Sequence, residues 1–105
     1  LECSDGTVFT GCNIENAAFG PTICAERTAV AKAVSEGHRD FVRIVIAGRC
    51  RELCVPCGVC RQVLREFAPH IEVICLNGAG EERTFRLPEL LPHSFGPEYL
   101  APETN

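Results

Sequence analysis

The spacing of hydrophobic residues changes several times along this chain, and each spacing predicts a different element. Apolar residues recur at helical period over 21–37 and again over 56–68, so both stretches are expected to form amphipathic helices. Apolar, β-branched runs over 41–48 and 71–77 predict buried strands, and 83–87 predicts one more. The core is therefore expected between helices and a sheet.

Turn residues and helix breakers set the two ends of this pattern. Ser4-Asp5-Gly6 separates two short extended runs within 1–14, which predicts a hairpin. Several prolines limit 87–105 to a short helix and a tail. Strands thus alternate with helices, which is typical of an α/β domain with helices packed on a mixed sheet. The length of 105 residues predicts one domain, 1–105.

One residue departs from the pattern of the first helix. Ile23, Val30, Ala33 and Val34 define the apolar stripe that should face the core. Glu26 falls on the same stripe, one turn before Val30. Because a buried carboxylate without a partner costs several kcal/mol or more, we expect this one to have a function.

Charge and hydropathy narrow the possible partners. The formal net charge is -4, whereas proteins that bind nucleic acid polymers usually carry a basic face. No apolar run reaches the length that spans a membrane. We therefore expect neither a polynucleotide nor a membrane as partner.

The cysteines admit two interpretations. One is a secreted disulfide scaffold, but several cysteines lie inside apolar runs, as small buried hydrophobic residues do. The other is free or metal-bound thiols in a reducing compartment, which predicts a cytoplasmic protein. The sequence has eight of them: Cys3, Cys12, Cys24, Cys50, Cys54, Cys57, Cys60 and Cys75.

Three cysteines stand at the predicted starts of the two helices. Cys57 and Cys60 are three residues apart, just after Pro56, so both sulfurs lie on one helix face and can reach one metal. Cys24 begins the first helix in the same way. Helix N-termini stabilise thiolates. Three thiolates can bind tetrahedral zinc and leave the fourth position open, as in catalytic sites.

Glu26 then acquires a function, because it follows Cys24 by two residues. A carboxylate beside a zinc-activated water can take the proton of that water and pass it on. The apolar stripe would give this carboxylate a dry pocket. The sequence therefore predicts a hydrolytic zinc site with Glu26 as its proton shuttle.

Other interpretations stay open at this point. Redox dithiols and structural zinc sites also use a Cys-x-x-Cys pair, and most glutamates on helices are simply solvated. The strongest alternative leaves Cys24 and Glu26 without a role. It is a closed zinc site or an iron–sulfur cluster on four cysteines: Cys50, Cys54, Cys57 and Cys60.

The chain resembles the zinc-dependent cytidine deaminases of pyrimidine salvage in three regions, which follow the family's order and spacing: GCNIENAAFGPTICAERTA, PCGVCRQVLREF and LLPHSFGPEYL. The three-cysteine form is similar to the small, homotetrameric class that acts on free nucleosides. The resemblance implies a three-layer α-β-α domain, with a mixed sheet of about five strands and helices on both faces. It also implies that the family's N-terminal helix and most of its first strand are missing here.

The resemblance implies one zinc ion per chain, held by Cys24, Cys57 and Cys60. Its hydroxide would attack C4 of cytidine or deoxycytidine. Glu26 would carry protons to N3 and to the departing amine, giving uridine or deoxyuridine and ammonia. Because three thiolates and a hydroxide leave zinc at a formal charge of about -2, a nearby cation should offset them. Arg27 is expected to do this, and Gln62 is expected near it behind the ligands.

Four residues are implied to bind the nucleoside. By the resemblance, Asn13 and Glu15 hold the ribose hydroxyls and the backbone of Ala25 contacts the base. Phe95 stacks on the pyrimidine of a neighbouring subunit, as in a homotetramer. Since the front of the fold is expected to be missing, a catalytically silent zinc-binding fragment or structural subunit remains the alternative function.

Overall fold

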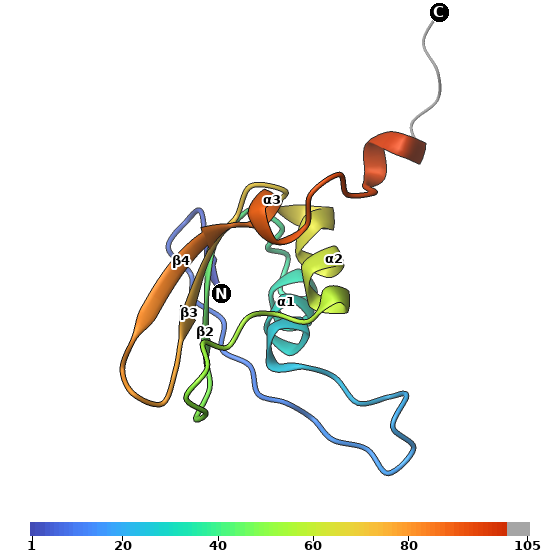
Figure 1. Cartoon of the computed structure of the whole chain (residues 1–105). Coiled ribbons are helices and arrows are strands. Elements are labelled where there is room, and N and C mark those ends of the chain that lie inside the picture. Colours follow the sequence, from blue (N-terminus) through green and yellow to red (C-terminus); the bar gives the residue numbers. More distant parts are fainter. Residues whose placement is uncertain (101–105) are drawn as a thin grey trace, which may run out of the picture.

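The computed structural model describes residues 1–100, in which four strands form one mixed sheet (Figure 1). In sheet order the strands are β1 (Glu2–Cys3), β2 (Phe41–Ala47), β3 (Glu72–Leu76) and β4 (Glu82–Arg86). β2 and β3 are parallel, and β1 and β4 join them antiparallel at either side. The predicted α/β class with a mixed sheet is confirmed.

The helices are α1 (Ala25–Ser35), α2 (Gly58–Phe67) and α3 (Leu87–Leu90), followed by the short 3-10 turn η1 (Pro97–Leu100). In Figure 1, α1 and α2 lie on the same face of the sheet. The expected third layer, on the other face, is not formed within residues 1–100. The two long helices bury their apolar sides against one face and against each other, and α3 is too short to cover the second.

The sheet also has one strand fewer than the expected five or so. The second extended run makes only isolated bridges, between Glu2 and Val8 and between Ile14 and Ile23. Residues 10–21 are exposed, and this part of the chain extends away from the body as a long loop (Figure 1). A local apolar pattern becomes a strand only when a partner strand binds its backbone groups, and here each of the two pairings stops after a single bridge.

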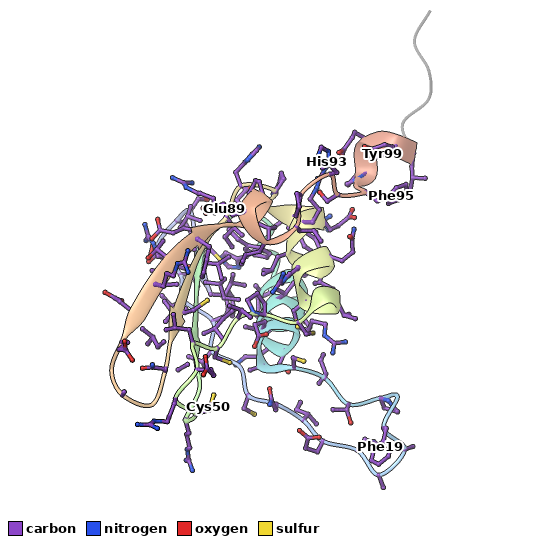
Figure 2. All side chains as sticks on the ribbon, viewed as in Figure 1. Phe19, Cys50, Glu89, His93, Phe95 and Tyr99 are labelled. Atoms are coloured by element: carbon purple, nitrogen blue, oxygen red, sulfur yellow. The ribbon has the colours of Figure 1, made fainter. Side chains whose placement is uncertain are left out.

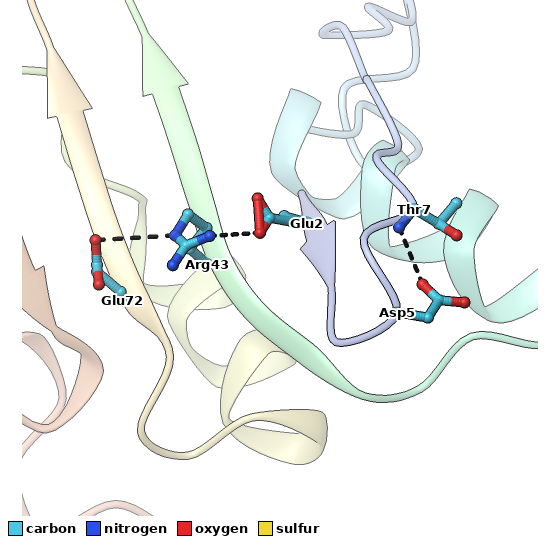
Figure 3. Close-up of polar contacts among 5 residues, drawn as sticks. All are labelled: Glu2, Asp5, Thr7, Arg43 and Glu72. Atoms are coloured by element: carbon cyan, nitrogen blue, oxygen red, sulfur yellow. Dashed lines mark hydrogen bonds and ion pairs between the residues drawn. The ribbon is translucent and has the colours of Figure 1, made fainter.

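The predicted hairpin at Ser4-Asp5-Gly6 is confirmed by its turn. Gly6 has a φ of 89°, a conformation that glycine adopts without steric cost. The carboxylate of Asp5 accepts a hydrogen bond of 3.0 Å from the backbone N–H of Thr7 (Figure 3). The turn therefore returns the chain along β1.

Charged side chains cross the uncovered face of the sheet in one row. The strand register aligns Glu2, Arg43 and Glu72, and Arg43 forms ion pairs with both carboxylates (Figure 3). Such exposed pairs contribute roughly 0–1 kcal/mol each. Their main effect is on strand register, because a slip by one residue would turn these charges into the core.

The core fills the space between the sheet and the two long helices. Ala33 of α1, Leu64 of α2, and Val73 and Cys75 of β3 are all 0% exposed. Alternate residues of β2 and β3 contribute, as expected for strands covered on one face. This packing brings the N-terminal ends of α1 and α2 together, and the candidate site lies there.

Candidate metal and catalytic site

Both long helices begin immediately after a cysteine. Cys24 is the N-cap of α1 and Cys57 is the N-cap of α2, each with extended backbone angles (φ -73°, ψ 154° and φ -67°, ψ 167°). The helices therefore start later than the sequence pattern predicts. Ile23 lies outside α1 and pairs with Ile14, and Pro56 precedes the cap of α2 instead of lying in its first turn.

Three sulfur atoms come together at these helix ends. Cys24 Sγ lies 3.9 Å from Cys57 Sγ, and Cys57 Sγ lies 3.4 Å from Cys60 Sγ. All three are within 4.8 Å of one another. Sulfur ligands of tetrahedral zinc are about 3.8 Å apart, because each Zn–S bond is about 2.3 Å long. The donor set fits zinc, and the exposed side at Cys57 leaves room for a fourth ligand.

The surroundings of the three thiols differ. The backbone N–H of Cys60, at the start of α2, lowers the pKa of Cys57 by stabilising its thiolate. Burial, together with the hydrogen bond to Cys57, raises the pKa of Cys60. Because zinc binds thiolates, metal binding at this cluster must release the Cys60 proton.

The half-buried guanidinium of Arg27 lies beside the sulfur atoms. Its Nη2 donates to Cys24 Sγ at 3.6 Å, and hydrogen bonds to Cys24 and then Cys60 raise the pKa of the guanidinium. Its Nε is buried and has no hydrogen-bond partner among residues 1–100. A fixed positive charge offsets the excess negative charge of a three-thiolate site.

Glu26 lies on the wall of a cleft and is half-buried, where the sequence pattern predicts a core position. The cleft has a volume of about 430 Å³ and runs along β2, with Ala25 and Ala29 beside Glu26. Within residues 1–100, no side chain forms a hydrogen bond or an ion pair with its carboxylate. Ala29, Val30 and Ala33 form the buried stripe of α1 instead. The carboxylate is thus available to a bound molecule.

The residues expected to bind the nucleoside lie in three different places. The Oδ1 atom of Asn13 accepts a hydrogen bond of 2.8 Å from the backbone N–H of Ala25, so these two residues meet at the start of α1. Glu15 lies in the exposed loop 10–21. Phe95 is exposed at the opposite end of the molecule from Phe19, which is in that loop (Figure 2).

Gln62 does not lie behind the metal ligands. Its Nε2 donates a hydrogen bond of 2.9 Å to the backbone carbonyl of Phe95. Gln62 is a neighbour of Cys60 in sequence, but its side chain leaves α2 on the outer side. The sequence expectation for this residue is therefore corrected to a contact with the C-terminal segment.

The remaining cysteines do not extend the cluster. Within residues 1–100, the group close enough to hold one metal comprises Cys24, Cys57 and Cys60. Cys50 Sγ instead donates a hydrogen bond of 3.4 Å to the Glu52 carbonyl. The four-cysteine alternative is therefore not supported. Across the described chain all eight thiols are free. Cys3 and Cys75 are buried as small hydrophobic residues, whereas Cys12 is exposed.

Sequence reasoning missed two arginines of α2. Arg61 donates to the carbonyl of Pro56, just before Cys57, and to that of Leu90, each at 2.7 Å. Arg65 donates to Ser94 Oγ at 2.7 Å. On a helix these positions suggest a solvated face. Their partners lie up to 33 residues away, so no local pattern identifies them.

Comparison with known proteins places this geometry in context. The family model described as "Cytidine and deoxycytidylate deaminase zinc-binding region" matches residues 1–77. The chain is 46% identical over 99 residues to a cytidine deaminase of Halalkalibacterium halodurans, covering 93% of this chain and 75% of that one. It is also 46% identical over 103 residues to a probable cytidine deaminase of Dictyostelium discoideum, covering 95% and 68%.

Solved structures give the same picture. The crystal structure of cytidine deaminase from Burkholderia pseudomallei aligns with a TM-score of 0.87 at 43% identity, covering 90% of this chain and 77% of that one. Cytidine deaminase from Mycobacterium tuberculosis aligns with a TM-score of 0.65 at 36% identity, covering 90% and 73%.

Among residues 1–100, no helix is both long enough and apolar enough to cross a lipid bilayer.

Proposed function

The chain belongs to the cytidine and deoxycytidylate deaminase family, and from this premise we propose that it hydrolyses the 4-amino group of cytidine or deoxycytidine. Water supplies the oxygen of the product, so that uridine or deoxyuridine and ammonia leave the site. One observation carries the proposal. The sulfur atoms of Cys24, Cys57 and Cys60 lie within 4.8 Å of one another, and Cys24 directly precedes Ala25 and Glu26, which line a cleft. Within residues 1–100, no side chain pairs with the Glu26 carboxylate.

Cys24, Cys57 and Cys60 would hold one zinc ion per chain. Bound there, zinc supplies a Lewis acid that makes water nucleophilic at neutral pH. Arg27 holds the Cys24 sulfur and keeps a positive charge behind the thiolates. The N-terminal ends of α1 and α2 add their partial positive charge to the same side.

Glu26 moves the protons of the reaction. Its carboxylate takes a proton from the attacking water and delivers protons to N3 of the pyrimidine and to the leaving amine. Asn13 keeps its side-chain N–H groups free for a ribose hydroxyl, because its oxygen is bound to the Ala25 amide. Glu15 would accept from the second hydroxyl, and the backbone of Ala25 would contact the base.

We place this activity in pyrimidine salvage and in the cytoplasm. Free nucleosides are the substrates of salvage reactions, and the cleft of about 430 Å³ is of a size typical of small-molecule sites. A reducing compartment keeps cysteines as thiols, the form from which metal ligands are made.

We further propose that the chain assembles into a homotetramer in which Phe95 completes the site of a neighbouring copy. Phe95 is exposed, at the opposite end of the molecule from Phe19 (Figure 2). Large apolar side chains are exposed at both ends of the molecule, with Phe19 86% and Leu100 76% accessible. We expect sedimentation velocity at micromolar concentration to show a closed oligomer, most simply a tetramer. A monomer under these conditions would contradict the proposal.

A second candidate function is a zinc-binding structural subunit without activity. The uncovered face of the sheet favours it, because Val45 is 51% exposed on β2 beside the catalytic cleft. An absorbance assay of cytidine loss, with zinc content measured on the same sample, decides between the two. One zinc per chain with turnover supports the deaminase. One zinc per chain without turnover, for either nucleoside, supports the structural subunit.

A further inference from the structure

The segment that carries Phe95 is held mainly by polar side chains of α2. Within 91–100, Gly96 is the one buried residue, so apolar packing contributes little to its position. Gln62 donates to the Phe95 carbonyl at 2.9 Å, and Arg65 Nε donates to Ser94 Oγ at 2.7 Å. Positions three and four apart on a helix share one side, so Gln62 and Arg65 face the same segment.

Arg65 makes the largest set of these contacts. In addition to Ser94, its guanidinium binds the carboxylate of Glu98, and the Arg65 side chain is 14% exposed. The backbone at Gly96 passes directly against it. A Cβ atom at Gly96 would lie 2.5 Å from the central carbon of the guanidinium. Arg65 thus touches Ser94 and Gly96, the two residues that flank Phe95.

The aromatic side chains in this segment are ordered relative to each other. The rings of Phe95 and Tyr99 stack with their centroids 5.1 Å apart and an interplanar angle of 20°. Both rings are exposed, and Figure 2 shows them next to each other near the C-terminal end of the described residues. Tyr99 directly follows Glu98, so the same guanidinium restrains both members of the stack.

We propose that Arg65 is a positioning residue, which fixes the Phe95–Tyr99 stack in the orientation in which Phe95 reaches the nucleobase in a neighbouring copy. This inference rests on the proposed function of Phe95. It adds that Arg65 acts on substrate binding through Phe95, without touching the substrate or the zinc. It also assigns Tyr99 the role of supporting the Phe95 ring from one side, which leaves the other face of that ring for a base.

The chain provides its own probe of this arrangement. Tyr99 is its one tyrosine, and the sequence has no tryptophan. The tyrosine band in near-ultraviolet circular dichroism therefore reports the order of the stack. In Arg65→Gln we expect this band to be lost, while far-ultraviolet circular dichroism and zinc content stay unchanged. The KM for cytidine should rise about tenfold, the scale of one charge-assisted hydrogen bond, with kcat within about threefold.

Two further variants control this experiment. Arg83→Gln removes an arginine that packs over the Phe85 ring on β4 and should change neither the tyrosine band nor KM. Gly96→Ala keeps Arg65 but displaces its guanidinium from Ser94 and Glu98, so it should reproduce the effects of Arg65→Gln. If Arg65→Gln fails to fold, Gly96→Ala carries the test alone.

A double-mutant cycle identifies the route of the effect. If Arg65 acts through Phe95, Arg65→Gln should add nothing to KM in a Phe95→Ala background. Additive effects would overturn the proposal, as would an unchanged tyrosine band. An unchanged KM in Phe95→Ala would overturn the proposed function of Phe95 itself. A raised KM in Phe95→Ala but not in Arg65→Gln would overturn the role of Arg65 alone.

Discussion

Glu26→Gln is expected to lower the rate of cytidine deamination by ~10⁴, while zinc stays bound and cytidine still binds. General acid–base catalysis by one group contributes ~10²–10⁴ in rate, and here the same carboxylate serves several proton transfers. Glutamine has nearly the same shape and still forms hydrogen bonds, but it cannot accept and release a proton. Single-turnover kinetics and zinc analysis on the purified variant measure both quantities.

The same substitution should not destabilise the fold. Glu26 is half-buried, and no side chain within residues 1–100 pairs with its carboxylate, so glutamine removes no stabilising contact. Removal of an unpaired charge from a partly apolar wall can raise the free energy of unfolding, since active-site groups are often placed at a cost in stability. A sharp fall in melting temperature with activity kept within a fewfold would instead make Glu26 the structural partner of a buried cation.

The second large effect is expected at the metal cluster itself. Cys57→Ser should lose the zinc ion and all measurable turnover, because two thiolates and a hydroxyl bind zinc far more weakly than three thiolates. When the free zinc concentration is about 1,000 times the Kd, zinc binding raises the free energy of unfolding of the folded chain by about 4 kcal/mol. The variant should therefore lose about that much free energy of unfolding, and a chelator should reduce the wild-type protein to the same value.

Cys50→Ser is the matched control for this experiment. Cys50 is exposed, lies in the loop before α2, and forms its hydrogen bond with the Glu52 carbonyl. Zinc content, turnover and unfolding should all stay at wild-type values. Equal zinc loss in Cys50→Ser and Cys57→Ser would support the alternative in which four cysteines bind the metal. Zinc retained by Cys57→Ser would remove Cys57 from the ligand set.

Local sequence predicted those parts of the site that lie within a few residues of one another. Cys57 and Cys60 are three apart at a helix start, and their sulfur atoms lie 3.4 Å apart in the structure. Arg27 follows Cys24 by three residues and reaches its sulfur. Helical geometry alone brings such pairs together, because residues three apart share one face of a helix.

Other features depend on partners far away in sequence. The strand expected within 1–14 has the right apolar pattern but pairs only through the bridge of Val8 to Glu2 and that of Ile14 to Ile23. The position of Glu26 falls on the apolar stripe that the sequence predicts for its helix, yet in the packed structure Glu26 lines the cleft along β2. Neither outcome can be obtained from periodicity, because both depend on which surface the element meets.

By itself, the sequence determined the α/β class with its mixed sheet, the two long helices and the type of chemistry. These follow from hydrophobic period and from residue types at fixed short spacing. The tertiary structure decided that Cys24 Sγ lies 3.9 Å from Cys57 Sγ, across 33 residues of sequence. It also decided that Arg65 binds Ser94 and Glu98 and thereby holds Phe95. Such contacts form only after the helices pack on the sheet, so no local pattern specifies them.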